Sequence, residues 1–472
     1  MFNGLIKNFS YTFAVNILSL VANSIIVFFI PHVSNIYVFS YFQLFLFYIG
    51  YIGYLQFGIT DGLYLRLGGK YYSELDFGRL RSEFFFLICF SVIECATIIF
   101  YLFLFIQDYT KMTVLILAAF NIVLILPWLF VLNILQSTNR IREYSFSIIC
   151  RLSTLLSLLI LTLFINRHNV TILCIAFSVS QAVALVSGMY FCKDILLCDS
   201  KWDKKAKEIV CSDFKRGISL TLSNLCGVMI IGIVLWCIEK KWDVVTFGKV
   251  SLAFSMANSL LIFVRAIAQA LFPILKRAKR EDIMNNYITY RKLLISIIFM
   301  LTMLYYPISI LIEIILPEYK LSIKFMGILV SIIIFESKKC ILLETYFKVL
   351  DFERLLLRSN LVTLLVSFCL SWVIILRMGS LVGAVIVIVF VIGFQTFVME
   401  KALNRFIGIN LNIDIFIEIL FAFLLIIFNW CIGGILGFFC NCIMSALLFY
   451  KNKKYINNIQ KILLNICLAK VI

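Results

Sequence analysis

Long apolar runs recur from one end of the chain to the other, and they limit what it can fold into. The first, YTFAVNILSLVANSIIVFFI, occupies residues 11–30. About 20 apolar residues in a helix cross the hydrocarbon core of a bilayer, where backbone polar groups must be satisfied within the segment. The runs lack the alternation of a transmembrane β-strand. The sequence therefore predicts an all-α polytopic membrane protein, in which the first run is a retained helix and not a signal peptide.

The number of spans follows from counting these runs. Of the 472 residues, 63% are hydrophobic and 14% are charged, whereas about 25% are charged in an ordinary soluble domain. Runs bounded by charged residues, glycine or proline predict about fourteen transmembrane helices. Only the turn CIGG at 431–434 separates the last two, so that twelve or thirteen spans remain an alternative.

Lysine and arginine are distributed unevenly between the loops. If the N-terminus is inside, 30 of the 42 lysines and arginines fall in inside segments and six fall in outside loops. Short cytoplasmic loops carry an excess of positive charge, so both termini are predicted to be cytoplasmic. The formal net charge of +17 is then a topology signal and a contact for anionic lipid headgroups, and no nucleic-acid partner is expected.

The longest charged connection divides the predicted spans into groups. We expect six helices in residues 1–192, a basic cytoplasmic linker at 193–216, six helices in 217–403, and helices 13 and 14 with a cytoplasmic tail in 404–472. Two six-helix halves are typical of transporters, in which a path between the halves opens to each side in turn. No loop has room for a soluble catalytic domain, so the chain is not expected to be an enzyme.

The cysteines and histidines give no pattern of a metal or cofactor site. The chain has 15 cysteines and two histidines. Most of the cysteines lie inside apolar runs, and no two are spaced as CxxC, so we interpret them as small apolar packing residues. No cofactor is expected.

Residues 58–72 form a glycine-rich stretch, GITDGLYLRLGGKYY, in which a lysine follows the last pair of glycines. A nucleotide-binding P-loop would need glycine where Tyr64 stands and serine or threonine where Tyr71 stands, so that reading fails. We interpret the stretch as a cytoplasmic elbow between the second and third spans. Asp61 within it either gates a cavity by pairing with a cation in the other half or simply starts the loop.

Three segments carry a resemblance to a known family. They are LQFGITDGLYLRLGGKYY at 55–72, FGKVSLAFSMANSLLIFVRAIAQALFPILKR at 247–277 and LLETYFKVL at 342–350. With the span count, they resemble Wzx-type polysaccharide repeat-unit flippases of the multidrug/oligosaccharidyl-lipid/polysaccharide (MOP) exporter superfamily.

The resemblance implies a MOP/MATE-like fold and a specific activity. It implies that an undecaprenyl-diphosphate-linked oligosaccharide, such as an O-antigen or capsule repeat unit, moves to the outer leaflet of a bacterial inner membrane. The polysaccharide polymerase and the chain-length regulator are the implied protein partners. A lipid II flippase and a drug antiporter of the same superfamily remain alternatives. A membrane polysaccharide polymerase is disfavoured, because no large external loop is present.

The eighth span carries the polar stripe that best suits a substrate cavity. Its face contains Ser255, Asn258, Arg265 and Gln269. A guanidinium offers a planar fork of donors to phosphate, so Arg265 is the candidate contact for the diphosphate. The alternative is hydrogen bonding between helices, with Arg265 paired to an acid. In the first span, Asn16 and Asn23 lie on one polar stripe, and they either line the same cavity or join helices.

Charged residues deep in other spans complete the candidate site, because an intramembrane charge usually faces a partner or a wet cavity. In the tenth span, Glu336 and Lys339 are three apart and can neutralise each other. Lys338 then either meets another acid or adds to a cationic lumen.

Two further deep charges lie in the third and fifth spans. Arg151 is a candidate cavity cation, and Glu94 is a candidate proton-coupling group. Alternatively, the two form a salt bridge with each other.

Overall fold

The chain is helical throughout the part that the structure describes. The computed structural model describes residues 2–166, 169–198, 206–277, 280–350, 352–409 and 411–469. Within those ranges, side chains are not described at 2–9, 163–166, 206–207, 260, 262–263, 265–277, 280–286, 348, 353 and 454–469. No β-strand occurs in the described residues. The expectation of an all-α polytopic membrane protein is confirmed.

The helices have the lengths that membrane spans need. Eleven segments of the described chain are long and apolar enough to cross a bilayer. Three further predicted spans are α3 (Ile36–Ile52), α11 (Val244–Arg277) and a segment interrupted within Lys320–Val349. Gly433 and Gly434, both with positive φ, separate the last two helices, so helices 13 and 14 are distinct.

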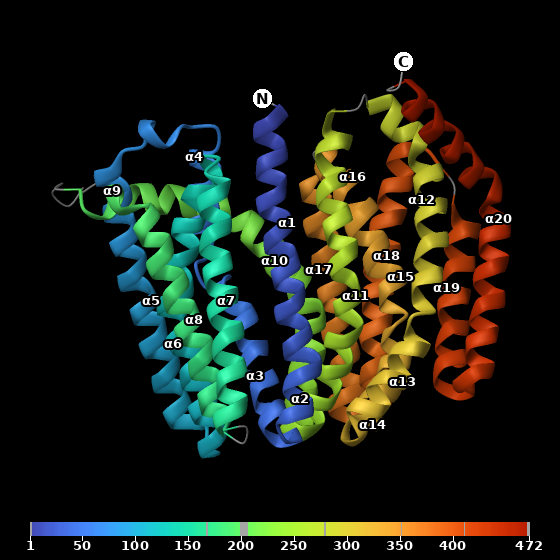
Figure 1. Ribbon diagram of the computed structural model, residues 1–472, viewed down its shortest axis with the longest axis horizontal. Coiled ribbons are helices and arrows are strands. Elements are labelled where there is room, and N and C mark those ends of the chain that lie inside the picture. The colour runs from blue at the N-terminus through green and yellow to red at the C-terminus, as the bar shows by residue number, and fades with distance from the viewer. Residues whose placement is uncertain are drawn as a thin grey trace. The chain divides into compact units, whose positions relative to one another are not determined.

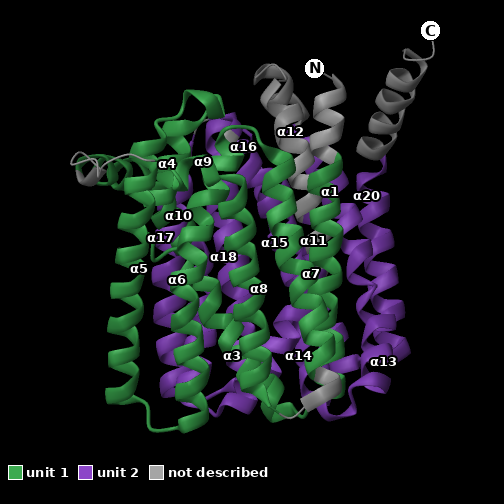
Figure 2. Ribbon diagram, turned by 60° about the vertical axis from the view of Figure 1, so that its left-hand side comes forward, with its two compact units in different colours: residues 1–225 green, residues 226–472 purple. Residues whose placement is uncertain are grey.

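The chain forms two compact units, Met1–Leu225 and Cys226–Ile472, coloured separately in Figure 2. The elements of the first unit are α1 (Phe2–Ser24), η1 (Ile25–Phe29), α2 (Ile30–Val33), α3 (Ile36–Ile52), α4 (Ile59–Leu67), η2 (Tyr72–Glu74), α5 (Phe77–Phe105), α6 (Tyr109–Ser137), α7 (Ile141–Asn166), α8 (Val170–Phe191), α9 (Lys193–Leu196) and the first part of α10 (Ala206–Lys241).

Polar caps start several helices of the first unit. Asn35 accepts a hydrogen bond from the Val38 amide at the start of α3, and Asp76 and Asp108 do the same for α5 and α6. Such caps satisfy backbone donors that have no partner within the helix. The long helices α5 to α8 run alongside one another, with α6 packed against α5 and α8, and α7 against α8 (Figure 1).

The second unit contains the rest of α10 and the elements that follow. They are α11 (Val244–Arg277), α12 (Arg280–Thr302), α13 (Tyr305–Ile315), η3 (Pro317–Tyr319), α14 (Lys320–Leu329), α15 (Ile332–Lys338), η4 (Lys339–Leu343), α16 (Glu344–Val349), α17 (Glu353–Leu370), η5 (Ser371–Arg377), α18 (Leu381–Ile407), α19 (Asn412–Ile427), η6 (Phe428–Ile432) and α20 (Gly434–Ala469). The segments η4, η5 and η6 are π-helical, a geometry frequent at functional sites.

The predicted elbow at 58–72 is only partly a loop. After α3 the chain turns through Phe57 and Gly58, which both have positive φ, and it then forms α4 from Ile59 to Leu67. Gly58 suits this position because glycine has no Cβ to clash at positive φ. The expectation of a loop was wrong for Ile59–Leu67, which form α4. Asp61 and Arg66 therefore lie on a helix.

Candidate functional site

A buried salt-bridge triad fixes α4 within the first unit. Arg66 Nη2 lies 2.6 Å from Glu83 Oε2 on α5 and 2.9 Å from Asp213 Oδ2 on α10. The two carboxylates are only 2% and 1% exposed. Removing one partner of such a buried group leaves an uncompensated charge. Arg66 lies in the stretch interpreted from sequence as a cytoplasmic elbow, and its ion pairs link three helices.

Glycines allow α4 to touch the backbone of α10. A Cβ added at Gly62 would lie 1.9 Å from the carbonyl oxygen of Asp213, and one added at Gly217 would lie 2.0 Å from the carbonyl oxygen of Gly58. These separations are far below van der Waals contact, so both positions require glycine. The spacing of Gly58 and Gly62 is the small-xxx-small pattern of close helix packing, a signal that sequence reasoning missed.

Asp61 lies in the first turn of α4 and bonds to the same stretch of α10. Its Oδ2 atom accepts a hydrogen bond from the Thr221 hydroxyl. Asp61 therefore lies in a helix and does not begin a loop. Within the described residues, its partner is the Thr221 hydroxyl, and it forms no ion pair with a cation.

The core of the second unit contains a closed ring of four charges. Arg291 Nε lies 2.5 Å from Glu400 Oε1, and Arg291 Nη1 lies 2.7 Å from Glu418 Oε1. Lys338 Nζ lies 2.6 Å from Glu400 Oε2 and 2.7 Å from Glu418 Oε2. None of the four side chains is more than 4% exposed. The ring has no net charge and joins α12, α15, α18 and α19.

The ring answers the question that the sequence left open for Lys338, which meets two acids. Sequence reasoning missed its other three members, Arg291, Glu400 and Glu418. Since the members come from four separate helices, no spacing in the sequence links them.

A second clamp ties the last two helices to the same unit. Asp414 on α19 lies 3.2 Å from Lys451 on α20 and 3.6 Å from Lys292 on α12. The Asn452 amide on α20 donates to Ser296 Oγ at 3.0 Å. Helices α19 and α20 are thus joined to the body of the second unit through charged and polar contacts.

Lys339 forms the pair that its spacing predicts. Its Nζ atom lies 2.7 Å from Glu336 Oε2 and donates to Gln395 Oε1 at 3.2 Å. Gln395 in turn donates to Asn360 Oδ1 at 2.9 Å. This buried polar chain connects α15 and η4 with α18 and α17. Glu336 is 15% exposed, more than either acid of the charge ring.

Glu94 and Arg151 do not form the salt bridge that the sequence left open. Among the described residues, Glu94 Oε2 is buried without a hydrogen-bond partner. The Arg151 guanidinium carbon instead lies 5.3 Å from the centre of the Trp128 ring. The two charges are therefore separate features of the first unit.

The remaining candidate residues lie on the predicted helices. Asn16 and Asn23 on α1, and Ser255 and Asn258 on α11, are partly buried. The side chains of Arg265 and Gln269 lie outside the described residues, so the predicted stripe is placed only in part. Where the chain is described, no group of three or more histidine, cysteine, aspartate or glutamate side chains could hold a metal ion.

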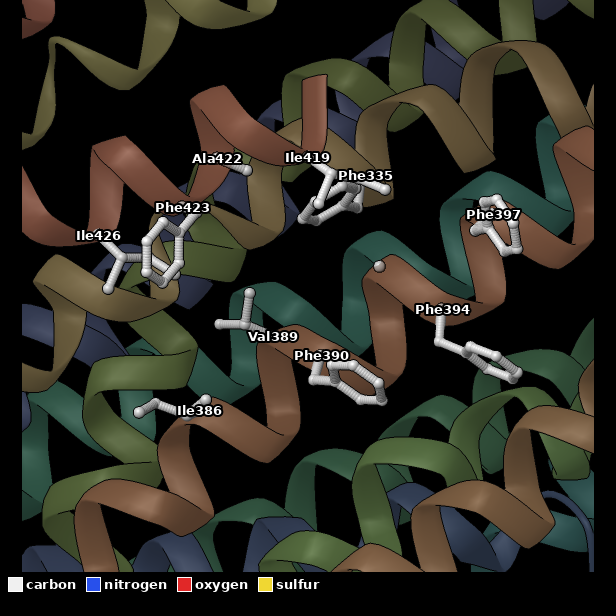
Figure 3. Close-up of a pocket in the computed structure, with 11 residues that line it drawn as sticks. Phe335, Ile386, Val389, Phe390, Phe394, Phe397, Ile419, Ala422, Phe423 and Ile426 are labelled. Carbon is white, nitrogen blue, oxygen red and sulfur yellow. The ribbon is translucent and has the colours of Figure 1, made fainter. Parts of the chain in front are cut away.

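An apolar pocket of about 340 Å³ opens in the second unit on α15, α18 and α19 (Figure 3). Its lining is Phe335, Ile386, Val389, Phe390, Gly393, Phe394, Phe397, Ile419, Ala422, Phe423 and Ile426. The same three helices supply Lys338, Glu400 and Glu418 to the charge ring. Phe390 and Phe423 are more than half exposed. A pocket of this composition suits hydrocarbon and offers no polar group to a sugar or phosphate.

Several solved structures share this arrangement of helices. The lipid II flippase MurJ in an inward closed conformation matches with a TM-score of 0.68 at 12% sequence identity, over 96% of this chain and 99% of that chain. The chain has a fold similar to that of MurJ. No family model and no curated protein sequence matches it.

Two MATE structures also match, less closely. An outward-facing multidrug resistance MATE transporter has a TM-score of 0.51 at 14% identity, over 86% of this chain and 94% of that chain. The eukaryotic MATE transporter AtDTX14 has a TM-score of 0.51 at 15% identity, over 84% and 95%. These neighbours are transporters and flippases rather than enzymes. The fold is accordingly that of a multi-pass membrane protein.

Proposed function

We propose that this protein is a flippase for an undecaprenyl-diphosphate-linked oligosaccharide, such as an O-antigen or capsule repeat unit. The observation that carries the proposal is the likeness to MurJ over nearly the full length of both chains. The MATE transporters match a smaller share of this chain, with lower TM-scores. The three sequence segments at 55–72, 247–277 and 342–350 favour a repeat-unit flippase over a lipid II flippase.

In the proposed mechanism, access to a polar cavity alternates between the two leaflets of a bacterial inner membrane, and both termini are cytoplasmic. The cavity holds the sugar headgroup and the diphosphate while the polyprenyl chain stays in lipid. An inside-negative potential favours outward movement of an anion by about 2.3 kcal/mol per charge per 100 mV. The potential, or a proton or sodium gradient, is the proposed energy source, with Glu94 and Glu336 as coupling candidates.

The substrate-binding residues that we propose are polar or cationic. We assign Arg265, Gln269, Asn258 and Ser255 in the second unit, and Asn16, Asn23 and Arg151 in the first unit, to binding of the substrate. Lys338 is neutralised by Glu400 and Glu418, so in this mechanism it holds helices together. The polymerase and the chain-length regulator remain the proposed protein partners.

Export in a strain that lacks its own repeat-unit flippase tests the function. We expect the wild-type chain to restore surface polysaccharide, measured by gel electrophoresis of the extracted polymer. Arg265→Ala, at normal protein abundance, is expected to lose this activity, because the cavity then lacks its proposed phosphate contact.

A strain depleted of its lipid II flippase is the matched control for substrate class. No rescue of growth is expected there. Rescue of growth without export of the polysaccharide would replace the proposal with the lipid II alternative.

Asp61 allows a separate test of gating. We expect Asp61→Ala to reduce export about tenfold at normal abundance. A change of this size lies within the range of typical coupling between two sites. Thr221→Val removes the same hydrogen bond but keeps the carboxylate, and it is expected to retain export. Equal losses in the two variants would mean that Asp61 only holds α4 against α10.

A further inference from the structure

Arg151 differs from the other cations whose side chains are described deep in the first unit. It lies on α7, ten residues into the helix, within a candidate membrane span. Within the described residues it forms no ion pair, and its Nε atom is buried without a hydrogen-bond partner. The side chain as a whole is partly exposed. By contrast, Arg66 is bound by both Glu83 and Asp213.

A charge held in a membrane span without a counter-ion is costly, by roughly 2.5 to 3.5 kcal/mol on insertion scales. Such a residue is retained where it faces a partner or a wet cavity. The described part of the chain supplies no carboxylate to Arg151, so a wet cavity or an anion from outside the described residues is left to stabilise the charge. An anionic substrate is one that the proposed function requires.

The aromatic ring beneath Arg151 is held in a fixed position. The Trp128 indole N–H donates to Ser147 Oγ at 3.0 Å, and that hydroxyl donates to the Ala184 carbonyl at 3.0 Å. A Cβ added at Gly188 would lie 3.2 Å from Val131 Cγ1, which is a tight contact, and 3.6 Å from Trp128 Cδ1, which is an ordinary one, so α8 packs closely against α6 beside the ring. We call Trp128, Ser147 and the Ala184 carbonyl the shelf of Arg151; they come from α6, α7 and α8.

The position of the Trp128 ring leaves the guanidinium able to bind an oxyanion. An aromatic face attracts a guanidinium and can cover one of its planar faces. The N–H groups lie in the guanidinium plane, so a ring over one face does not block them, and the two Nη atoms can bind two oxygens side by side. The bonds to Trp128 fix the ring before any ligand arrives, which reduces the ordering cost of binding.

We propose that Arg151 binds the diphosphate of the lipid-linked substrate, with Trp128 and Ser147 as positioning residues. This inference rests on the proposed function and adds to it the substrate group that the first unit recognises. A compact ammonium at this position would keep the charge but lose the planar fork. The chemistry at Arg151 is thus specific for an oxyanion, whichever sugars the substrate carries.

Binding measurements on the full-length protein in lipid nanodiscs test the assignment. The probes are undecaprenyl diphosphate and the uncharged undecaprenol. We expect the wild type to bind the diphosphate more tightly than the alcohol. Arg151→Ala is expected to weaken diphosphate binding about 10- to 100-fold, the range for losing hydrogen bonds to a charged group, and to leave undecaprenol binding unchanged. Arg151→Lys is expected to give an intermediate loss.

Variants of Trp128 test its positioning role through diphosphate binding, a measurement that a purely structural role would leave unchanged. Trp128→Phe keeps an aromatic face and is expected to bind diphosphate nearly as the wild type does, whereas Trp128→Ala is expected to resemble Arg151→Lys. The matched control is Arg140→Ala. Arg140 also stacks on a ring, that of Tyr72, but it is paired with Glu143 and bonds to the Phe191 carbonyl, so its loss should leave binding unchanged.

The outcomes separate this inference from the proposed function. If the wild type binds diphosphate and folded Arg151→Ala or Arg151→Lys binds it equally well, the assignment of Arg151 is wrong and the proposed function stands. If the wild type does not distinguish diphosphate from the alcohol and fails to restore export, the proposed function itself fails. Thermal melting of each variant shows that it is folded.

Discussion

Replacing Glu400 by alanine is expected to lower the free energy of unfolding by about 3 to 5 kcal/mol. Glu400 is fully buried and lies 2.5 Å from Arg291 and 2.6 Å from Lys338. Without it, two buried cations share the single carboxylate of Glu418. Melting of the purified protein in detergent and its abundance in membranes measure the effect, and we expect both to fall sharply.

Two further variants make this prediction specific. Glu143→Ala removes a partly exposed acid whose pair with Arg140 is 3.4 Å long, and it is expected to change stability by less than about 1 kcal/mol. The double variant Lys338→Met with Glu418→Gln keeps the Arg291 and Glu400 pair and is expected to be more stable than Glu400→Ala. Melting of Glu400→Ala at the wild-type temperature would show that the ring does not hold the four helices.

Gly62→Ala is the second change for which we expect a large effect. The added Cβ would lie 1.9 Å from the backbone oxygen of Asp213, and backbone cannot move aside as the end of a side chain can. Overpacking of this kind typically costs about 1 to 3 kcal/mol and sometimes more. We expect the separation of α4 from α10 to break the Arg66 ion pairs as well, with loss of export and a lower melting temperature.

Gly50→Ala is the matched control, because it adds the same methyl group to a helix one span away. Apart from its chain neighbours and the backbone of its own helix, no atom lies within 4 Å of a Cβ built at Gly50. Alanine also favours the helix, so this variant is expected to be neutral or more stable by up to about 1 kcal/mol. If Gly62→Ala melted and exported as Gly50→Ala does, the close contact of α4 with α10 would not exist in the working protein.

The charge ring also changes the interpretation of the last two helices. Sequence reasoning treated them as a pair appended to two six-helix halves. The structure joins α19 through Glu418 and Asp414, and α20 through Lys451 and Asn452, to helices of the second unit. We therefore expect the pair to belong to the same stable body as α12 and α18.

Spans, their approximate number and the all-helical class were predictable from the sequence, because hydrocarbon imposes the same local rule on every segment. A helix must satisfy its own backbone and be apolar for about 20 residues. The Glu336 and Lys339 pair was predictable for a similar reason, since three residues along one helix place two side chains on the same face.

The partners of the other buried charges depended on tertiary structure. The sequence by itself determined that Lys338, Arg151 and Glu94 lie deep in spans, and that such charges need an explanation. Only the folded chain showed that Lys338 meets acids from α18 and α19, that Arg66 joins three helices, and that Arg151 rests on Trp128. The physical reason is that charge pairing acts through space over a few ångströms, and residues that meet across helices share no spacing along the chain.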